Sequence, residues 1–113
     1  MADGNTVVIT VTAGKRDGGR LYAEAKPDRV VVHAGDTIQW NIVATEDVRN
    51  VRPAHFRLTA TWLEPAPFSG RVKRLRGGGY AARTARSGLT RVYKYDIMVG
   101  DVIVADPEVQ IKD

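Results

Sequence analysis

The sequence contains no cysteine, and this absence excludes three kinds of chemistry. Without thiols the chain can form no disulfide, no zinc–thiolate site and no cysteine nucleophile. Histidine is also scarce, with 2 residues in 113, so a metal site built from imidazoles has few candidates. We therefore expect neither a cysteine-dependent enzyme nor a cysteine-ligated metal protein.

Long apolar runs are missing as well. No stretch approaches the roughly 18 apolar residues that a membrane-spanning helix needs. The first residues, MADGNTVVITVT, lack the basic and apolar regions of a signal peptide. These absences predict no membrane association, and a cytoplasmic location if the chain is the full-length product. A chain of 113 residues is expected to form one domain, spanning residues 1–113.

The apolar residues show no helical spacing of useful length, whereas two-residue alternation recurs throughout the chain. In residues 37–43, for example, Ile38, Trp40 and Ile42 alternate with polar side chains. Such segments, bounded by Gly, Pro, Asn or Asp, are typical of strands. We expect strands at residues 6–12, 21–25, 29–33, 37–43, 55–63, 71–76, 89–99, 102–105 and 108–112.

Between these strands, residues 44–54 are expected to form a loop, and residues 80–88 a loop or one or two helical turns. The strand spacing predicts an all-β fold, an antiparallel Greek-key β-sandwich. An immunoglobulin or fibronectin-type sandwich is the alternative architecture. The expected core comprises Val7, Ile9, Val11, Val30, Val32, Ile38, Trp40, Ile42, Phe56, Leu58, Trp62, Tyr95, Ile97, Val99, Ile103 and Val109.

Residues 26–43, KPDRVVVHAGDTIQWNIV, carry the most specific pattern of the chain. This stretch resembles the second and third strands of cupredoxins, which have a similar proline, apolar run, Ala-Gly-Asp-Thr turn and Trp-bearing strand. The resemblance implies a cupredoxin-like sandwich. It does not imply a blue-copper centre, because such a site needs a thiolate ligand that this sequence lacks. We therefore expect a copper-free scaffold without a cofactor.

The histidines and one methionine leave a weaker metal hypothesis. The nearest match to a cupredoxin histidine ligand is His55, within Pro53-Ala54-His55-Phe56. A different copper site, formed by His55, Met98 and His33, stays an alternative. The ordinary interpretation is that the histidines lie at strand ends and the methionine fills a gap, because two histidines without fixed spacing carry little information about metals.

Catalytic patterns are missing too. The thirteen acidic residues are scattered and mostly lie at turns, where Asx hydrogen bonding explains them. No serine lies in a nucleophile-elbow context, and the Gly77–Gly79 run lacks the ending of a phosphate loop. We therefore expect no enzymatic activity and infer no small-molecule substrate.

Positive charge is concentrated in one segment of this basic chain, whose net charge is +4. Residues 65–95 hold eight of the seventeen basic residues and none of the acidic ones. Within it, a Gly-rich arm or loop at about residues 69–88 can present arginines to carboxylates or phosphates. The candidate binding residues are Arg71, Lys73, Arg74, Arg76, Tyr80, Arg83 and Arg86.

These features favour a non-enzymatic module that binds a protein partner or assembles with copies of itself. Nucleic-acid binding through residues 71–91, with Tyr80 as a stacking platform, is the first alternative. Copper handling through His55 and Met98 is the second. A plainer interpretation is a solvated edge strand, in which Lys and Arg discourage edge-to-edge aggregation.

Overall fold

A computed structural model describes residues 5–58, 68, 71–84 and 91–112. These residues form no helix, and none of them belongs to a segment that could cross a membrane as a helix. The strands are β1 (Thr6–Lys15), β2 (Leu21–Lys26), β3 (Arg29–His33), β4 (Thr37–Ala44), β5 (Val51–Leu58), β6 (Lys73–Arg74), β7 (Tyr80–Arg83), β8 (Arg91–Val99), β9 (Val102–Ala105) and β10 (Glu108–Lys112).

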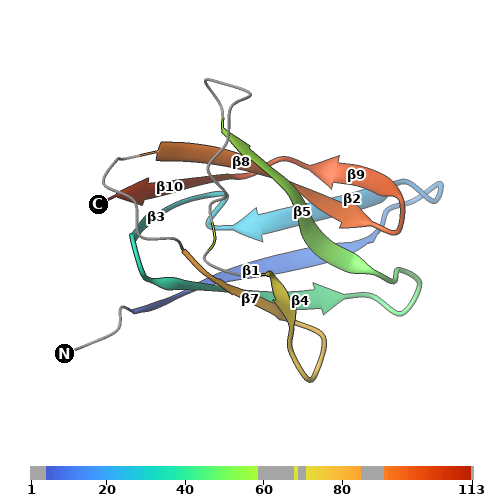
Figure 1. Cartoon of the computed structure of the whole chain (residues 1–113). Coiled ribbons are helices and arrows are strands. Elements are labelled where there is room, and N and C mark those ends of the chain that lie inside the picture. The colour runs from blue at the N-terminus through green and yellow to red at the C-terminus, as the bar shows by residue number, and fades with distance from the viewer. Residues whose placement is uncertain (1–4, 59–67, 69–70, 85–90, 113) are drawn as a thin grey trace.

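The described strands pair into two sheets that pack against each other (Figure 1). The first sheet has the order β2-β1-β4-β7-β6, and the second has the order β3-β10-β8-β5, with β9 also paired to β8. Each sheet contains one parallel pair, β1 with β4 and β3 with β10. The prediction of a purely antiparallel fold was therefore wrong, whereas the all-β class is confirmed. Alternation within a strand does not reveal the direction of its neighbour, so the sequence left this open.

Most strands begin and end within a few residues of their expected limits, and β3, β9 and β10 match them. Two segments differ. Residues 51–54 belong to β5 rather than to a loop, and residues 80–83 form β7 rather than a loop or helical turn. Both segments have weak alternation of their own, and pairing with β8 and β4 supplies their extended conformation.

Aromatic side chains fill the space between the sheets. Trp40 of β4 and Tyr95 of β8 are fully buried, with ring centroids 5.7 Å apart. The Trp40 indole Nε1–H donates a hydrogen bond of 3.1 Å to the Tyr95 hydroxyl. Phe56 stacks on Tyr95, and Phe68 meets the edge of Phe56. This cluster joins both sheets, and burial raises the pKa of Tyr95 to about 12 despite the Trp40 hydrogen bond.

Most of the predicted core is buried, but Ile103 is 56% exposed. It lies opposite Met98 in the β8–β9 pair, and alternation in β8 turns Met98 away from the core face that Ile97 and Val99 share. Val7, Ile42 and Phe56 are half-buried. Of the remaining predictions, the side chain of Leu58 and the whole of Trp62 lie outside the described part of the chain. Buried residues that the pattern missed are Ala13, Ala25, Val48, Val51, Ala82, Tyr93, Met98 and Ile111.

The segment of cupredoxin resemblance crosses from one sheet to the other, with β3 in the second sheet and β4 in the first. The buried carboxylate of Asp36 fixes the turn between them by accepting 2.9 Å hydrogen bonds from the backbone N–H groups of His33 and Asn5. The Thr84 hydroxyl, which accepts from Gly35 N–H at 2.9 Å, ties the same turn to the end of β7.

Candidate functional site

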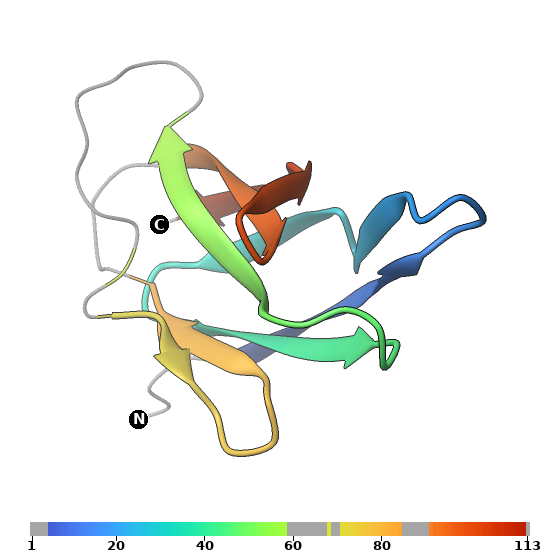
Figure 2. The same ribbon diagram turned by 90° about the vertical axis from the view of Figure 1, so that its right-hand side faces the viewer.

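The described part of the basic arm forms a β-hairpin, β6–β7, in which Lys73 pairs with Ala81 and Arg74 with Tyr80. Its turn is closed by hydrogen bonds between Leu75 and both Gly78 and Gly79. We name residues 71–83 the basic hairpin. It occupies one end of the first sheet and protrudes from the body of the protein (Figure 2). Arg86 lies outside the described residues.

The hairpin does not present its predicted binding residues on a single surface. Tyr80 pairs with buried Trp40, so Tyr80 and its partner Arg74 are on the core side of the sheet. Lys73 and Arg83 alternate with them and lie on the outer side. Lys73 and Arg83 therefore lie on the outer side of the sheet and Arg74 on the inner side, although Lys73 and Arg74 are both exposed.

The cations in the described part of the chain divide into those that pair with a carboxylate and those that do not. Lys26, Arg29 and Lys94 each lie within 3.7 Å of a carboxylate. In contrast, four predicted binding residues form no ion pair with any described residue. These residues are Arg71, Lys73, Arg74 and Arg76. All four are exposed, so the hairpin carries positive charge that the described part of the chain does not compensate.

His55 lies at an irregularity of β5, where the register with β8 shifts between Ala54 and Arg57. Its φ of 56° lies in the left-handed region, and its ring Nδ1 is 2.9 Å from Oδ2 of the buried Asp96. Arg57 donates to the other Asp96 oxygen at 3.1 Å. The carboxylate therefore orients the imidazole, whose side chain is 56% exposed. An oriented, exposed imidazole can accept a proton or bind a cation through its free nitrogen.

The other residues of the copper hypothesis have different neighbours. Met98 is buried, and its sulfur lies 3.8 Å from a guanidinium nitrogen of Arg52. The ring of His33 lies 4.0 Å from the Asp36 carboxylate at the β3–β4 turn. Across residues 5–58, 68, 71–84 and 91–112, no group of three or more His, Asp or Glu side chains is arranged to hold a metal ion.

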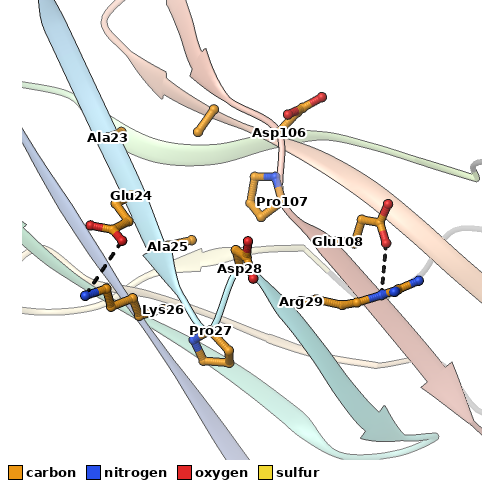
Figure 3. Close-up of a pocket in the computed structure, with 11 residues that line it drawn as sticks. Ala23, Glu24, Ala25, Lys26, Pro27, Asp28, Arg29, Asp106, Pro107 and Glu108 are labelled. Carbon is orange, nitrogen blue, oxygen red and sulfur yellow. Dashed lines mark ion pairs between the residues drawn. The ribbon is translucent and has the colours of Figure 1, made fainter.

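A groove of about 700 Å³ lies between the corner that joins β2 to β3 and the corner that joins β9 to β10 (Figure 3). Charged side chains line it, but several pair with one another. Glu24 lies 3.7 Å from Lys26, and Glu108 lies 3.1 Å from Arg29. The groove therefore offers less uncompensated charge than the basic hairpin does.

A smaller hollow of about 130 Å³ lies where the basic hairpin meets the segment joining β4 to β5. Arg74, Gly78 and Tyr80 contribute one part of its wall, and Arg49 and Asn50 contribute another. Its apolar lining includes Ile42, Val48 and Val51. None of the residues that line it is acidic.

Sequence reasoning identified Arg74 and Tyr80 but missed Arg49, which lies 25 positions earlier in a polar loop. It also missed the contacts of Asp96 and Arg57 with His55. Alternation within residues 73–83 could have separated Lys73 from Arg74. No local sequence signal could have predicted that Arg49 lies beside the hairpin. The two segments come together only because β4 pairs with β7.

No protein-family model matches the sequence, and a search of curated proteins found no match.

Proposed function

We propose that this protein is a non-enzymatic binding module, built on a copper-free cupredoxin-like Greek-key sandwich, that docks an acidic protein partner through the basic hairpin. The observation that carries the proposal is the set of four exposed hairpin cations that have no carboxylate partner among the described residues. Electrostatic complementarity of this kind steers association and selects a partner of opposite charge.

The scaffold part of the proposal rests on the segment 26–43. Its cupredoxin-like sequence pattern coincides with a strand-turn-strand unit that connects the two sheets. The parallel pairs β1–β4 and β3–β10 favour this scaffold over an immunoglobulin-type sandwich, whose two sheets are antiparallel.

A separate protein is a better partner than a second copy meeting hairpin to hairpin, because that contact would oppose like charges. Both residues of β6 are exposed, so this strand is open to an extended acidic segment. Such a segment can add along β6, the last described strand of its sheet, while its carboxylates pair with Lys73 and its neighbours.

The test compares two variants that each lose one lysine and one arginine. Lys73→Gln with Arg76→Gln neutralises the basic hairpin, and Lys26→Gln with Arg20→Gln is the matched control at the other end of the first sheet. Binding of a labelled glutamate-rich peptide at low salt is followed by fluorescence anisotropy. We expect about tenfold weaker binding for the hairpin variant, because each exposed charge pair contributes about 0.2–1 kcal/mol. The control should bind like the wild type.

Equal losses of peptide affinity in both variants would show that only the net charge of the protein matters, which would contradict the proposal. Tighter binding of single-stranded nucleic acid than of the peptide, with a steep salt dependence, would favour the nucleic-acid alternative instead. A solution mass well above 12.4 kDa that falls when the hairpin is neutralised would move the partner from another protein to a second copy.

A further inference from the structure

Two arginines from distant parts of the chain, Arg49 and Arg74, line the hollow beside the basic hairpin. Arg74 reaches it from β6, and Arg49 reaches it from the segment between β4 and β5. Neither side chain forms an ion pair or a hydrogen bond with a described residue. Arg52 and Arg57, in contrast, donate to backbone and carboxylate oxygens. The hollow is thus lined by two cations with unused donors.

The surroundings of these cations include both apolar and polar side chains. Val48 and Val51 belong to the buried core and form part of the lining. Arg49 and Arg74 are themselves exposed, so an anion held by them would contact this apolar lining on one side and solvent on the other. Tyr80 and Asn50 add a hydroxyl and an amide that make no hydrogen bond with described residues.

The wall of the hollow is fixed before any ligand enters. Asn50 has a φ of 57°, and its carbonyl oxygen accepts hydrogen bonds from Gly100 N–H at 3.2 Å and from Arg52 Nη1 at 3.3 Å. On the hairpin side, Gly78 N–H donates to the Leu75 carbonyl at 3.1 Å. Fixed walls reduce the ordering cost of binding.

Size restricts what the hollow can hold. Sites for small molecules and cofactors usually measure roughly 300–1,000 Å³. A volume of about 130 Å³ suits one functional group of a larger ligand instead. One arginine can satisfy a carboxylate with two parallel hydrogen bonds. Two arginines and a phenol match a phosphate monoester better, since it carries about −1.5 to −2 charge and three acceptor oxygens.

We propose that this hollow binds the phosphate group of a phosphorylated side chain on the partner protein, with Arg49 and Arg74 as its ligands. The inference rests on the proposed function and makes it specific. The basic hairpin attracts an acidic segment, and the hollow selects a phosphorylated one. Phosphorylation of the partner then acts as the switch for binding.

The test uses two acidic peptides that differ only in a central phosphoserine or glutamate. Anisotropy measures the affinity of each for the wild type and for the variants Arg49→Gln, Arg74→Gln and Arg76→Gln. Arg76 is the control, because it belongs to the same hairpin but does not line the hollow. We expect the wild type to bind the phosphoserine peptide about tenfold tighter. Either of the first two variants should abolish that preference, and Arg76→Gln should weaken both peptides equally.

A preference that is missing in the wild type, or that survives Arg49→Gln and Arg74→Gln, overturns the inference. If the two peptides bind equally well, the result supports the proposed function and contradicts the phosphate site. If neither peptide binds, the result contradicts both the proposed function and the phosphate site. Inorganic phosphate provides a check without a partner. It should shift the amide resonances of Asn50 and Gly78, whereas chloride of equal ionic strength should not.

Discussion

At the scale of single residues, Tyr95 illustrates how burial changes the ionisation of a side chain. Its ring stacks on Phe56 and meets the edge of Trp40, and its hydroxyl accepts the only hydrogen bond that the Trp40 indole makes within the described residues. Because the phenolate would lose its hydration in this position, burial raises the pKa of Tyr95 to about 12. The same side chain therefore holds the two sheets together and resists ionisation.

We predict two effects of Tyr95→Phe. At pH 7 the free energy of unfolding should fall by about 1–3 kcal/mol, because the indole N–H loses its acceptor in a buried position. Above pH 10 the wild type should lose stability as pH rises toward 12, since the unfolded tyrosine ionises first and draws the equilibrium toward unfolding. Urea titrations at pH 7 measure the first effect, and urea titrations between pH 9 and 11.5 measure the second. The unfolding free energy of the variant should fall less steeply with pH than that of the wild type. Identical pH dependences would contradict the burial argument.

At the scale of elements, the basic hairpin depends on a close approach to β4. Gly79 lies where a Cβ atom would be 2.7 Å from the Trp40 carbonyl oxygen. The hydroxyl of Thr84, just after β7, donates to the Asp36 carbonyl at 2.8 Å. The hairpin is thus held at its base by β4 and by the turn that precedes β4, while Lys73 and Arg74 of β6 are exposed at the edge of the sheet.

Gly79→Ala should displace the hairpin from β4, because the clash is with backbone that cannot rotate away. We expect a loss of about 1–3 kcal/mol in unfolding free energy and weaker binding of the glutamate-rich peptide. Gly14→Ala is the matched control, since the atoms nearest to its Cβ belong to the Tyr22 side chain, whose hydroxyl oxygen would be 2.8 Å away. The Tyr22 side chain can move, so the control should lose less unfolding free energy than Gly79→Ala. Denaturant unfolding of both variants decides the comparison, and equal losses would refute the importance of the β4 contact.

At the scale of the whole molecule, stability is distributed unevenly between the interior and the edges of the sheets. β4 pairs with β1 and β7, and β8 pairs with β5, β9 and β10. β6 pairs only with β7 among the described strands. The proposed docking edge, β6, therefore has few backbone contacts of its own, although hydrogen bonds close the turn that follows it.

Amide hydrogen exchange should follow this distribution. We expect the slowest exchange in β4 and β8, which open only with global unfolding, and faster exchange in β6 and the turn at residues 75–79. Mass spectrometry of peptide fragments would measure it. Protection of β6 equal to that of β4 would show that the hairpin is part of the rigid core. Added phosphoserine peptide should slow exchange in the hairpin more than in β2.

The sequence by itself determined the all-β class, most strand limits and the concentration of positive charge in residues 65–95. These properties are local, because alternation and turn residues act within a few positions of the chain. The same alternation predicted the inward-facing Tyr95, Ile97 and Val99 of β8, all of which are buried. The exposure of Ile103 was not predicted by alternation. It depends on the register between β9 and β8, which places Ile103 opposite Met98 and away from the core face.

Only the tertiary structure decided the parallel pairs, the division of the hairpin cations between two faces and the meeting of Arg49 with Arg74. Parallel pairing requires a crossover whose direction no single strand encodes. The contact of His55 with Asp96 likewise spans 41 positions and forms because β5 pairs with β8. Composition fixed how much charge the hairpin carries, whereas sheet pairing decided on which side of the sheet Lys73 and Arg74 lie.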